Sequence, residues 1–409
     1  MSDNLEISGE TSMNQTEIRK AFPTFKNDST LVYLDNAATT QKPQTMLERI
    51  MHYYTYENAN IHRGNYPLSN HALEIYEQSK QSVCDWIDAN DREEIVYTKS
   101  STEAVNLLAH ICEGIVKPGN NIVTTELEHS SNYFPWKELC KKTGAEFRVA
   151  KANPQGCIEE GDIQHFIDKN TKIVTVTGMS NVTGFMPDLL SICKTAHKYG
   201  ALLAVDGTQL VAHKKISVKK LDCDFMFFSA HKMYGPMGLG ILYGKKSLLN
   251  SLPPFLLGGG MVSFCDHNKL CYQSGSLKYE AGTQNLSAAA GMKATIDFLQ
   301  ENQFDKLLEN ERQLAAKMRA AVSEIEGIKI LNAQNDSPIF IFEAEHMGAY
   351  DLGVMLGLRN IAIRCGAHCA YPFMKRIKKQ SVCRISLGIY NNDEDLYRLT
   401  SILKECKIR

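Results

Sequence analysis

The chain has 409 residues, of which 44% are hydrophobic and 22% charged, which predicts a globular protein with two or three domains, or one large and one small. The formal net charge of −1 gives no electrostatic reason to expect a nucleic-acid partner. The longest apolar runs, such as ALLAV, have strand length and predict no membrane span. The first twenty residues have no apolar core and contain four acidic residues, which argues against a signal or transit peptide and predicts a cytoplasmic protein.

Twelve cysteines are distributed along the chain, and no two of them have C-x-x-C spacing. The usual zinc-ribbon and thioredoxin patterns are therefore absent from the sequence. In a reducing cytosol we expect most of these thiols to be free and to pack as small apolar side chains. Core positions are predicted for those in helical patterns or beside a buried strand, namely Cys84, Cys112, Cys140, Cys193 and Cys223.

Short apolar runs alternate with amphipathic stretches between about residues 30 and 250. The apolar runs predict seven strands, at residues 93–98, 121–126, 145–150, 172–178, 201–207, 224–230 and 240–244. Helical patterns lie between most of them, for example at residues 101–115 and 188–200. This alternation predicts a mostly parallel sheet covered by helices on both faces, with ligands bound at the carboxyl ends of the strands.

The pattern changes near residue 285. Residues 286–327 predict one long helical stretch, and strands at IFIFEAE, IAIRCG and VCRISLGIYN then alternate with helices, which indicates an α+β second domain. We predict a large domain over residues 22–290 and a small domain formed by residues 1–21 and 291–409. The glycine-rich residues 256–283 predict a long irregular loop, and loops of that length are usually functional.

The strongest functional signal is FFSAHKMYGPMGLG, at residues 227–240. A buried strand ends in Ser229, and His231, Lys232 and a glycine-rich turn follow at once. A lone lysine beside a strand end is normally solvated. Held in a pocket, Lys232 could form a Schiff base with pyridoxal phosphate, which also needs a carboxylate at its ring nitrogen, a phosphate cradle and a group over the ring.

Candidates for the carboxylate and the ring cover occur at the ends of other predicted strands. Asp206 ends ALLAVD and is either a helix cap or the carboxylate at the ring nitrogen. Gln209, three residues later, could hydrogen-bond the phenolic oxygen of the ring. His129 in LEHSSN is a candidate ring cover or a structural hydrogen-bonding residue, and Asn181 in SNVTG is equally ambiguous alone.

The phosphate cradle is predicted at KSSTEAVN, residues 99–106, where a strand ends and a helix begins. Free N–H groups at a helix N-terminus, together with hydroxyl groups, bind phosphate well. Ser100 and Glu103 also have the spacing of an ordinary capping box, so this motif is weak alone. The order of the motifs is more informative, because each motif follows a successive strand. In chain order they are the cradle, the histidine, the asparagine, Asp-x-x-Gln and Ser-x-His-Lys.

This succession resembles the fold-type I, class V aminotransferase group of pyridoxal phosphate enzymes. Within it the chain is similar to the group II (Suf-type) cysteine desulfurases, which are closely related to selenocysteine lyases. The resemblance extends from YLDNAATTQKP at residues 33–43 to CRISLGIYN at residues 383–391 and includes NIHRGNYPLS, YEAGTQN and RCGAHCAYP. It implies an α/β fold with a mostly parallel seven-stranded sheet in the large domain and a smaller α+β domain that carries a catalytic cysteine loop.

The resemblance also implies roles for residues around the cofactor. Lys232 would hold the cofactor as a Schiff base and shuttle protons, while His129 would stack on the ring and assist proton transfer. Asp206 would pair with the pyridinium, Gln209 would contact the phenolic oxygen, and Asn181 would lie near cofactor or substrate. The residues implied to hold the phosphate are Ser101, Thr102, Ser229 and His231.

Substrate and subunit contacts are implied in the same way. Arg384 would bind the substrate carboxylate, for which an Arg fork is suited, and Arg364 is a second substrate-binding candidate. Thr283 would reach the phosphate site of a partner subunit, which implies a homodimer. His62 and Arg63 fall in an active-site segment.

The sulfur-accepting cysteine of the family matches Cys369 in RCGAHCAYP, while Cys365 is expected to be a packed or spare thiol. The reducing cytosol argues against a disulfide, and crowding of Cys365, His368 and Cys369 in one short loop argues against a metal site. Three positions depart from the family pattern. SSTE stands where a Gly-Thr-Thr-Glu-like sequence is usual, Ala367 stands where His is frequent, and Cys365 replaces a commoner Thr.

The implied reaction converts L-cysteine to L-alanine, with the sulfur held as a persulfide on Cys369 and passed to a Suf-type acceptor for iron–sulfur cluster assembly. The alternatives are a selenocysteine lyase, another class V enzyme such as an epimerase or C–S lyase, and a non-catalytic sulfur-relay scaffold. The scaffold would be expected to have lost Lys232 or Asp206, and both are present. The basic run KRIKK at residues 375–379 could dock an acidic partner or form a solvated helix face.

Overall fold

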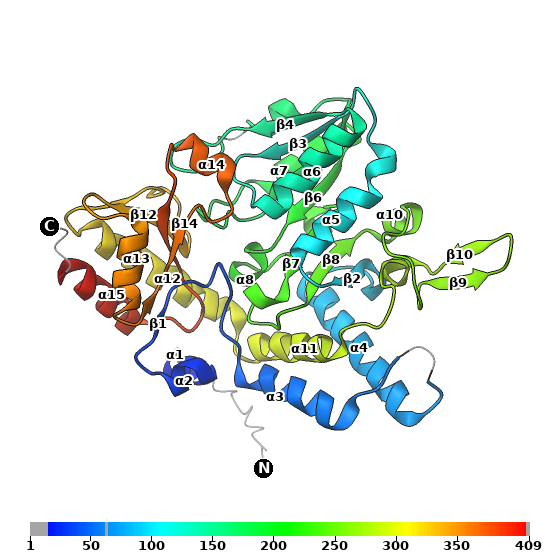
Figure 1. Cartoon of the computed structure of the whole chain (residues 1–409), viewed down its shortest axis with the longest axis horizontal. Coiled ribbons are helices and arrows are strands. Elements are labelled where there is room, and N and C mark those ends of the chain that lie inside the picture. Colours follow the sequence, from blue (N-terminus) through cyan, green and yellow to red (C-terminus); the bar gives the residue numbers. More distant parts are fainter. Residues whose placement is uncertain (1–14, 62–63, 160, 406–409) are drawn as a thin grey trace, which may run out of the picture.

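The computed structural model describes residues 15–61, 64–159 and 161–405 (Figure 1). The predicted active-site residues His62 and Arg63 lie outside these ranges. Within the described ranges, no helix is both long enough and apolar enough to cross a membrane.

A seven-stranded sheet forms the centre of the larger part of the molecule, as the alternating pattern predicts. Its strand order is β2-β8-β7-β6-β5-β3-β4. The strands from β4 to β7 pair in parallel, and β8 pairs antiparallel with both of its neighbours. Their bounds are β2 (Ile95–Thr98), β3 (Asn121–Thr125), β4 (Glu146–Ala150), β5 (Thr171–Thr177), β6 (Leu202–Asp206), β7 (Phe225–Ser229) and β8 (Gly240–Gly244).

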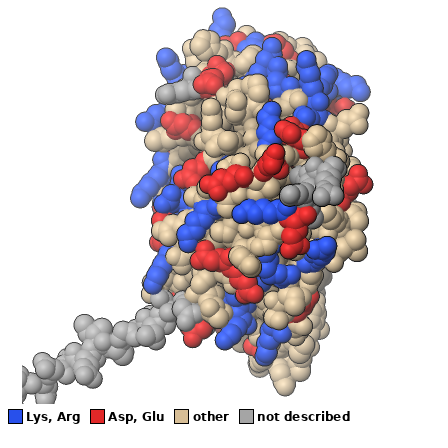
Figure 2. Space-filling model, turned by 90° about the vertical axis from the view of Figure 1, so that its left-hand side faces the viewer, with Lys and Arg blue, Asp and Glu red and all other residues tan. Residues whose placement is uncertain are grey.

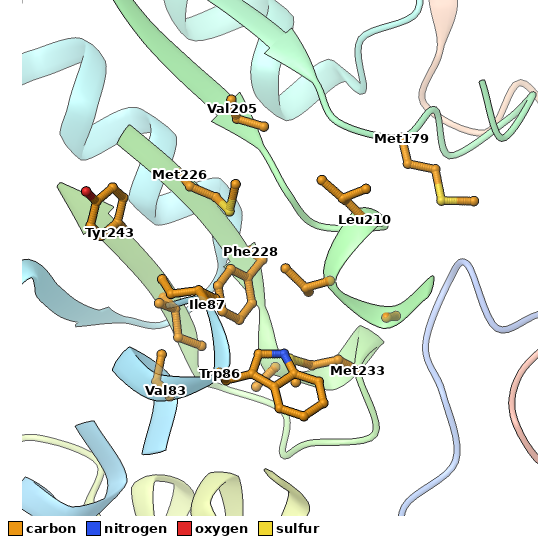
Figure 3. Packing of buried hydrophobic residues seen from close by; sticks show 14 of the residues in the cluster. Val83, Trp86, Ile87, Met179, Val205, Leu210, Met226, Phe228, Met233 and Tyr243 are labelled. Atoms are coloured by element: carbon orange, nitrogen blue, oxygen red, sulfur yellow. The ribbon is translucent and has the colours of Figure 1, made fainter. Parts of the chain in front are cut away.

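Helices cover both faces of this sheet because successive side chains of each buried strand point to opposite faces. Phe225 and Phe227 of β7 join one apolar cluster with α5 (Ser101–Ile111) and α6 (Ser130–Thr143). Met226 and Phe228 join the other. That second face is covered by α4 (Pro67–Trp86), α7 (Leu189–Lys198), α8 (Leu210–His213) and α11 (Leu286–Glu301). Figure 3 shows Phe228 beside Trp86 and Ile87 in this cluster.

A smaller antiparallel sheet forms the C-terminal part, with strand order β11-β12-β15-β14. Its bounds are β11 (Ile328–Ile330), β12 (Ile339–Ala344), β14 (Arg364–Gly366) and β15 (Val382–Ser386). Its apolar cluster is completed by α12 (Phe304–Ser323), α13 (Ala349–Gly357) and α15 (Asp393–Glu405). The early strand β1 (Val32–Tyr33) pairs in parallel with β13 (Ile361–Ala362), so residues 32–33 lie against this part.

The remaining helices lie at the periphery or between the two sheets. In Figure 1, α11 runs beside α3 and α4, against which it packs. The bounds of these helices are α1 (Gln15–Lys20), α2 (Pro23–Asn27), α3 (Gln44–His52), α9 (Val218–Leu221), α10 (Lys246–Ser251) and α14 (Tyr371–Arg376). Figure 2 shows basic and acidic side chains intermixed over the face at the left of Figure 1, in keeping with the near-zero net charge.

Two predictions about local structure were wrong in detail. The helical stretch predicted from residue 286 is two helices, because Gln303 between α11 and α12 has the left-handed φ of 52°, which ends the first helix. The segment 256–283 is not wholly irregular. It contains a hairpin of β9 (Val262–Cys265) and β10 (Leu270–Tyr272), which projects from the body in Figure 1. Most side chains of this hairpin are exposed, so core burial gave no periodic signal for it.

Candidate active site

A cavity of about 260 Å³ opens at the carboxyl ends of β5, β6 and β7, where sheets of parallel strands bind ligands. Residues from strand ends, from the N-termini of α5 and α6 and from the segment after β1 line it. The sequence-predicted residues among them are Lys232, Asp206, Gln209, His129, Asn181, Ser101, Thr102, Ser229 and His231. Residues as far apart in the chain as Ala38 and Lys232 therefore meet at one edge of the sheet, where the strands that precede most of them end.

Lys232 and Asp206 face this cavity from neighbouring strands. After β7 ends at Ser229, one 3₁₀ turn, Ala230–Lys232, places the lysine over the strand end. Burial lowers the pKa of Lys232 to about 8, against the opposing charge of Asp206. Burial also raises the pKa of Asp206, although the hydrogen bond that the Thr208 N–H donates to its Oδ1 at 2.9 Å favours the ionised form. A buried carboxylate beside a lysine of lowered pKa favours a cationic or electrophilic ligand in the cavity.

Hydroxyl groups gather where α5 begins. The Ser101 N–H donates to Ser229 Oγ at 2.8 Å, and Ser229 Oγ lies 2.9 Å from Ser101 Oγ. Thr102 Oγ1 and Ser131 Oγ are 2.8 Å apart across the gap between α5 and α6. Ser100 is the N-cap and accepts the Glu103 N–H at 3.2 Å. The capping and phosphate-cradle interpretations of this motif are therefore compatible, because the cap uses only the third N–H of the helix.

A glycine allows the strand to approach this cradle. A Cβ atom on Gly240, the first residue of β8, would lie 2.3 Å from the carbonyl carbon of Ser100. Any larger residue would push β8 away from the turn that begins α5.

His129 is the N-cap of α6, and its ring nitrogen Nδ1 accepts the Ser131 N–H at 3.1 Å. Because Nδ1 accepts, we infer that the neutral ring carries its proton on Nε2. Burial lowers the pKa of His129 to about 4, and the charges of Lys232 and Arg384 act in the same direction. At neutral pH, His129 is thus an uncharged ring with one N–H donor at the edge of the cavity.

Two buried polar atoms in the cavity wall have no hydrogen-bond partner within the described part of the chain. They are Asn181 Oδ1 and Thr208 Oγ1. Such an atom costs about 1–3 kcal/mol when it is left unpaired, so two in one wall indicate a polar ligand. The cavity therefore offers the groups that pyridoxal phosphate needs. They are a lysine, a buried carboxylate, unpaired polar atoms and a hydroxyl cluster at a helix N-terminus.

Arg384 and Arg364 lie beside the cavity and share one carboxylate. Arg384 Nη2 is 3.1 Å from Asp35 Oδ1, and its Nη1 donates to the carbonyl of Asn181 at 2.9 Å. The Arg384 side chain is 2% exposed, and its Nε atom has no partner among the described residues. Arg364 donates two parallel hydrogen bonds to the same carboxylate, from Nε to Asp35 Oδ1 at 3.0 Å and from Nη2 to Oδ2 at 2.8 Å. The Arg364 side chain is half-exposed.

The loop after β14 carries Cys369 on the open side of the site. His368 and Cys369 have φ values of 52° and 53°, a left-handed conformation that costs about 1–3 kcal/mol for each such residue. Asn181 Nδ2 donates to the His368 carbonyl at 2.8 Å, which ties this loop to the end of β5. The thiol of Cys369 is exposed, and it lies close enough to Lys232 and Arg384 to influence the pKa of each.

Cys365 has a different environment from Cys369. It pairs with Cys383 across β14 and β15, and the two sulfur atoms are 3.6 Å apart. A Cβ atom on Gly353 of α13 would come within 2.5 Å of the Cys365 sulfur, so this thiol packs against that helix. The side chain of Cys365 thus contributes to packing, as expected for a spare thiol. Cys84, Cys112, Cys140, Cys193 and Cys223 are buried in the core, as predicted.

Thr283 is the predicted cofactor contact that the chain does not bring to this cavity. It lines a separate cavity of about 270 Å³ together with Lys99, Glu103 and Glu280. Thr283 is therefore not part of the wall of the cavity that Lys232 lines in the same chain.

Sequence reasoning missed several residues that shape the site. Asp35 joins the two arginines, and Glu128 is a buried carboxyl whose pKa burial raises to about 8. Glu128 accepts hydrogen bonds from Thr125, Asn132 and the Thr177 N–H, and so holds the turn before His129 against the end of β5. A single acidic residue forms no sequence motif, so nothing in the local sequence indicates such a role.

Comparisons with known proteins agree with this geometry. The profile of the family described as Aminotransferase class-V matches residues 32–399. A "Probable cysteine desulfurase" from Halalkalibacterium halodurans is 37% identical over 97% of this chain and 98% of its own length. A "Cysteine desulfurase" from Synechococcus elongatus is 36% identical over 95% of this chain, which spans only 63% of that longer relative. The solved structure of an apo cysteine desulfurase from Thermococcus onnurineus superposes with a TM-score of 0.92 at 32% identity, covering 96% of this chain and 98% of that one.

Proposed function

The chain belongs to the class V aminotransferase family, and from this we propose that it is a pyridoxal phosphate-dependent cysteine desulfurase. It would convert L-cysteine to L-alanine and retain the sulfur as a persulfide on Cys369. The observation that carries the proposal is one cavity lined by Lys232 and Asp206, beside which a loop presents an exposed thiol. Relatives named cysteine desulfurase over nearly the whole chain support the same reaction.

We propose the following residues as the cofactor site. Asp206 would face the ring nitrogen, Gln209 the phenolic oxygen and His129 the ring face, while Lys232 would form the covalent link. The phosphate would be held by Ser101, Thr102, Ser229 and His231 at the start of α5. When bound, pyridoxal phosphate supplies an electron sink that makes the Cα proton of an amino acid acidic.

The side chains around the cavity would bind the substrate and move its protons. Arg384 offers its guanidinium to the substrate carboxylate, and its buried Nε, which has no partner among the described residues, leaves one donor free for that purpose. Lys232, with its pKa lowered to about 8, is suited to take a proton from Cα near neutral pH and to return it later. The N–H of the uncharged His129 can donate to a group that gains negative charge beside it.

Cys369 would act as the nucleophile toward the substrate sulfur. Its thiolate would form the new S–S bond, and the Cβ–S bond of the substrate would break with its electron pair moving to the carbon skeleton. Protonation of that skeleton yields alanine, so no external oxidant or reductant is required.

The finer assignment is to the group II (Suf-type) enzymes, with a Suf-type protein as sulfur acceptor and iron–sulfur clusters as the destination. The short interval between β14 and α14, which keeps Cys369 near the cavity, supports it. We also propose a cytoplasmic homodimer in which Thr283 serves the partner's site, and domains bounded at residues 22–290 and at 1–21 with 291–409. The run 375–379 is only a partial candidate for docking the acceptor, because Arg376 and Lys379 already pair with Glu126 and Glu343.

The decisive experiment is mass spectrometry of the holoenzyme after brief exposure to L-cysteine, with Cys369→Ser beside it. One added sulfur on the Cys369 peptide, together with alanine release that the substitution abolishes, is the expected result. Alanine or selenide release that survives Cys369→Ser, with L-selenocysteine preferred as substrate, would replace the proposal by a selenocysteine lyase. Absence of any cofactor absorbance in the purified protein would contradict the proposed cofactor link to Lys232 and, with it, the whole proposed reaction.

A further inference from the structure

Ser130 holds the backbone of the cysteine that would receive the sulfur. Its backbone N–H donates to the carbonyl oxygen of Cys369 at 2.8 Å, and its side-chain Oγ donates to the same oxygen at 2.8 Å. Ser130 is the first residue of α6 and follows His129 directly. The contact joins residues 239 positions apart in the chain, one on the seven-stranded sheet side and one on the cysteine loop.

This contact lies where the loop needs external support. His368 and Cys369 are consecutive non-glycine residues with left-handed φ values, and such residues persist only where the surrounding structure holds them. The carbonyl of His368 is held by Asn181, and the carbonyl of Cys369 is held by Ser130. Because the Cys369 thiol is itself exposed, the position of its sulfur depends on these backbone contacts and not on packing of the side chain.

The same turn also faces the cofactor side of the cavity. Ser131 donates its N–H to His129 Nδ1, and its hydroxyl lies 2.8 Å from Thr102 Oγ1 in the hydroxyl cluster. Three consecutive residues of one helix start therefore have different contacts: His129 and Ser131 at the cavity, and Ser130 at the cysteine loop. Loss of the Ser130 contacts should affect the loop and leave the other two contacts in place.

We propose that Ser130 is a positioning residue for the sulfur-transfer step, because its two donors set where the thiol of Cys369 lies relative to the bound substrate. The inference rests on the proposed desulfurase function and adds to it a residue that controls formation of the persulfide. Ser130 touches neither the substrate nor the reacting sulfur in this assignment, so it acts only through Cys369.

The position of Ser130 in the helix allows both donors to be removed with little disturbance. Proline is well tolerated as the first residue of a helix and has no N–H. His129, which would precede the proline, has φ −62° and ψ 147°, the extended conformation that a following proline favours. Ser130→Pro therefore removes both hydrogen bonds, Ser130→Ala removes only that of the hydroxyl, and Ser130→Thr retains both donors.

The experiment compares these holoenzymes in two measurements. The first is the rate of persulfide formation on Cys369 in a single turnover with L-cysteine, followed by mass spectrometry. The second is the rate at which iodoacetamide alkylates Cys369 without substrate. We expect persulfide formation to fall about threefold in Ser130→Ala and about tenfold or more in Ser130→Pro, since each step removes a hydrogen bond, with Ser130→Thr near wild type. Alkylation should change in the same order, while cofactor absorbance and the KM for L-cysteine stay at wild-type values.

Ser191→Ala is the matched control, because Ser191 lies in the first turn of α7, its hydroxyl accepts from Gln164, and neither residue lines the cavity. Equal persulfide and alkylation rates in wild type and Ser130→Pro would overturn the inference. If Ser130→Pro melts well below the wild type, the pair Ser130→Ala and Ser130→Thr decides, and identical rates for that pair would equally overturn it. A wild-type enzyme that forms no persulfide on Cys369 would instead contradict the proposed function.

Discussion

The buried guanidinium of Arg384 forms an ion pair with the partly buried carboxylate of Asp35, with Arg384 Nη2 3.1 Å from Asp35 Oδ1. Asp35 also lies in a β-bridge with Ser386 of the neighbouring strand, so the carboxylate is fixed on the side of the smaller sheet. Moving the Arg384 guanidinium away from Asp35 would leave a buried charge uncompensated, which is costly. The ion pair therefore holds the guanidinium in one orientation. In the proposed role of Arg384, the substrate carboxylate would be bound by a guanidinium whose orientation Asp35 already fixes.

Replacing Arg384 with Lys should weaken substrate binding more than the same change at Arg364. The lysine keeps the charge but loses the planar fork and the bond to the Asn181 carbonyl, so we expect the KM for L-cysteine to rise about tenfold or more. Arg364→Lys is the matched comparison, because its pair with the same Asp35 is half-exposed and screened by water. Steady-state alanine formation measures both. A larger effect at Arg364 would reverse the proposed order of the two arginines.

Lys232→Ala should abolish turnover while the protein still binds cofactor. Loss of the proton-transferring amine should lower alanine formation by at least about 10²-fold, whereas Asp206 and the hydroxyl cluster remain to hold the cofactor. The measurement combines alanine release with the position of the visible absorbance band, which should shift because the covalent link is lost. Lys215→Ala, which removes an exposed lysine paired with Asp305, is the control and should keep both properties. Substantial turnover without Lys232 would require another base.

Cys365→Thr should retain persulfide formation within about twofold, because the Cys365 sulfur faces Cys383 and α13. Cys369→Ser should lose it entirely. Peptide mapping after L-cysteine treatment shows which sulfur receives the label. Added sulfur on Cys365 in the wild type would contradict the assignment of the nucleophile.

Stability should fall in acid through three histidines whose pKa values are lowered by their partial or full burial. Burial lowers the pKa of His129 and His231 to about 4 and that of His368 to about 3. The unfolded chain, with ordinary histidine pKa values near 6.5, then binds more protons than the folded chain between about pH 6.5 and pH 3. Stability from these groups is complete above about pH 6.5 and is lost as the pH falls through this window.

Thermal melting across pH 7 to pH 4 measures this loss. His368→Gln removes a titrating ring, and the longer amide can still donate toward the Val382 carbonyl that His368 Nε2 contacts at 3.1 Å. We expect this variant to show a shallower decrease of Tm with falling pH than the wild type. A parallel decrease in both proteins would show that His368 does not contribute.

The position of Thr283 predicts a complementation experiment. Thr283 lines a different cavity from Lys232, and we have proposed that it serves the partner's site. A mixed dimer of Lys232→Ala and Thr283→Ala chains would then contain one complete site, with Lys232 from one chain and Thr283 from the other. Its activity, at limiting cofactor concentration, should exceed that of either homodimer. Activity no higher than the average of the two homodimers would place Thr283 in its own chain's site.

Much of the fold was predictable because most strands of the large sheet are buried on both faces. Continuous apolar runs such as those of β6 and β7 have no other common explanation at that length, and all seven predicted strands are present. The break at Gln303 and the hairpin at residues 262–272 were missed, because neither is marked by a burial period. Gln303 adopts its conformation between two amphipathic helices whose sequence pattern runs on across it.

Some residues of the candidate site were likewise predictable from the sequence, and others were not. Polar residues that end successive parallel strands, such as Asp206 and Lys232, meet at one edge of the sheet, so their sequence positions alone indicated a shared cavity. Which of them point into it, and with what pKa, depends on burial that only the packed structure defines. The contacts of Asp35 with Arg384 and of Ser130 with Cys369 join segments more than 200 residues apart. No local spacing encodes such pairs, because they arise only when the cysteine loop and the large sheet are packed against each other, and tertiary structure alone decided them.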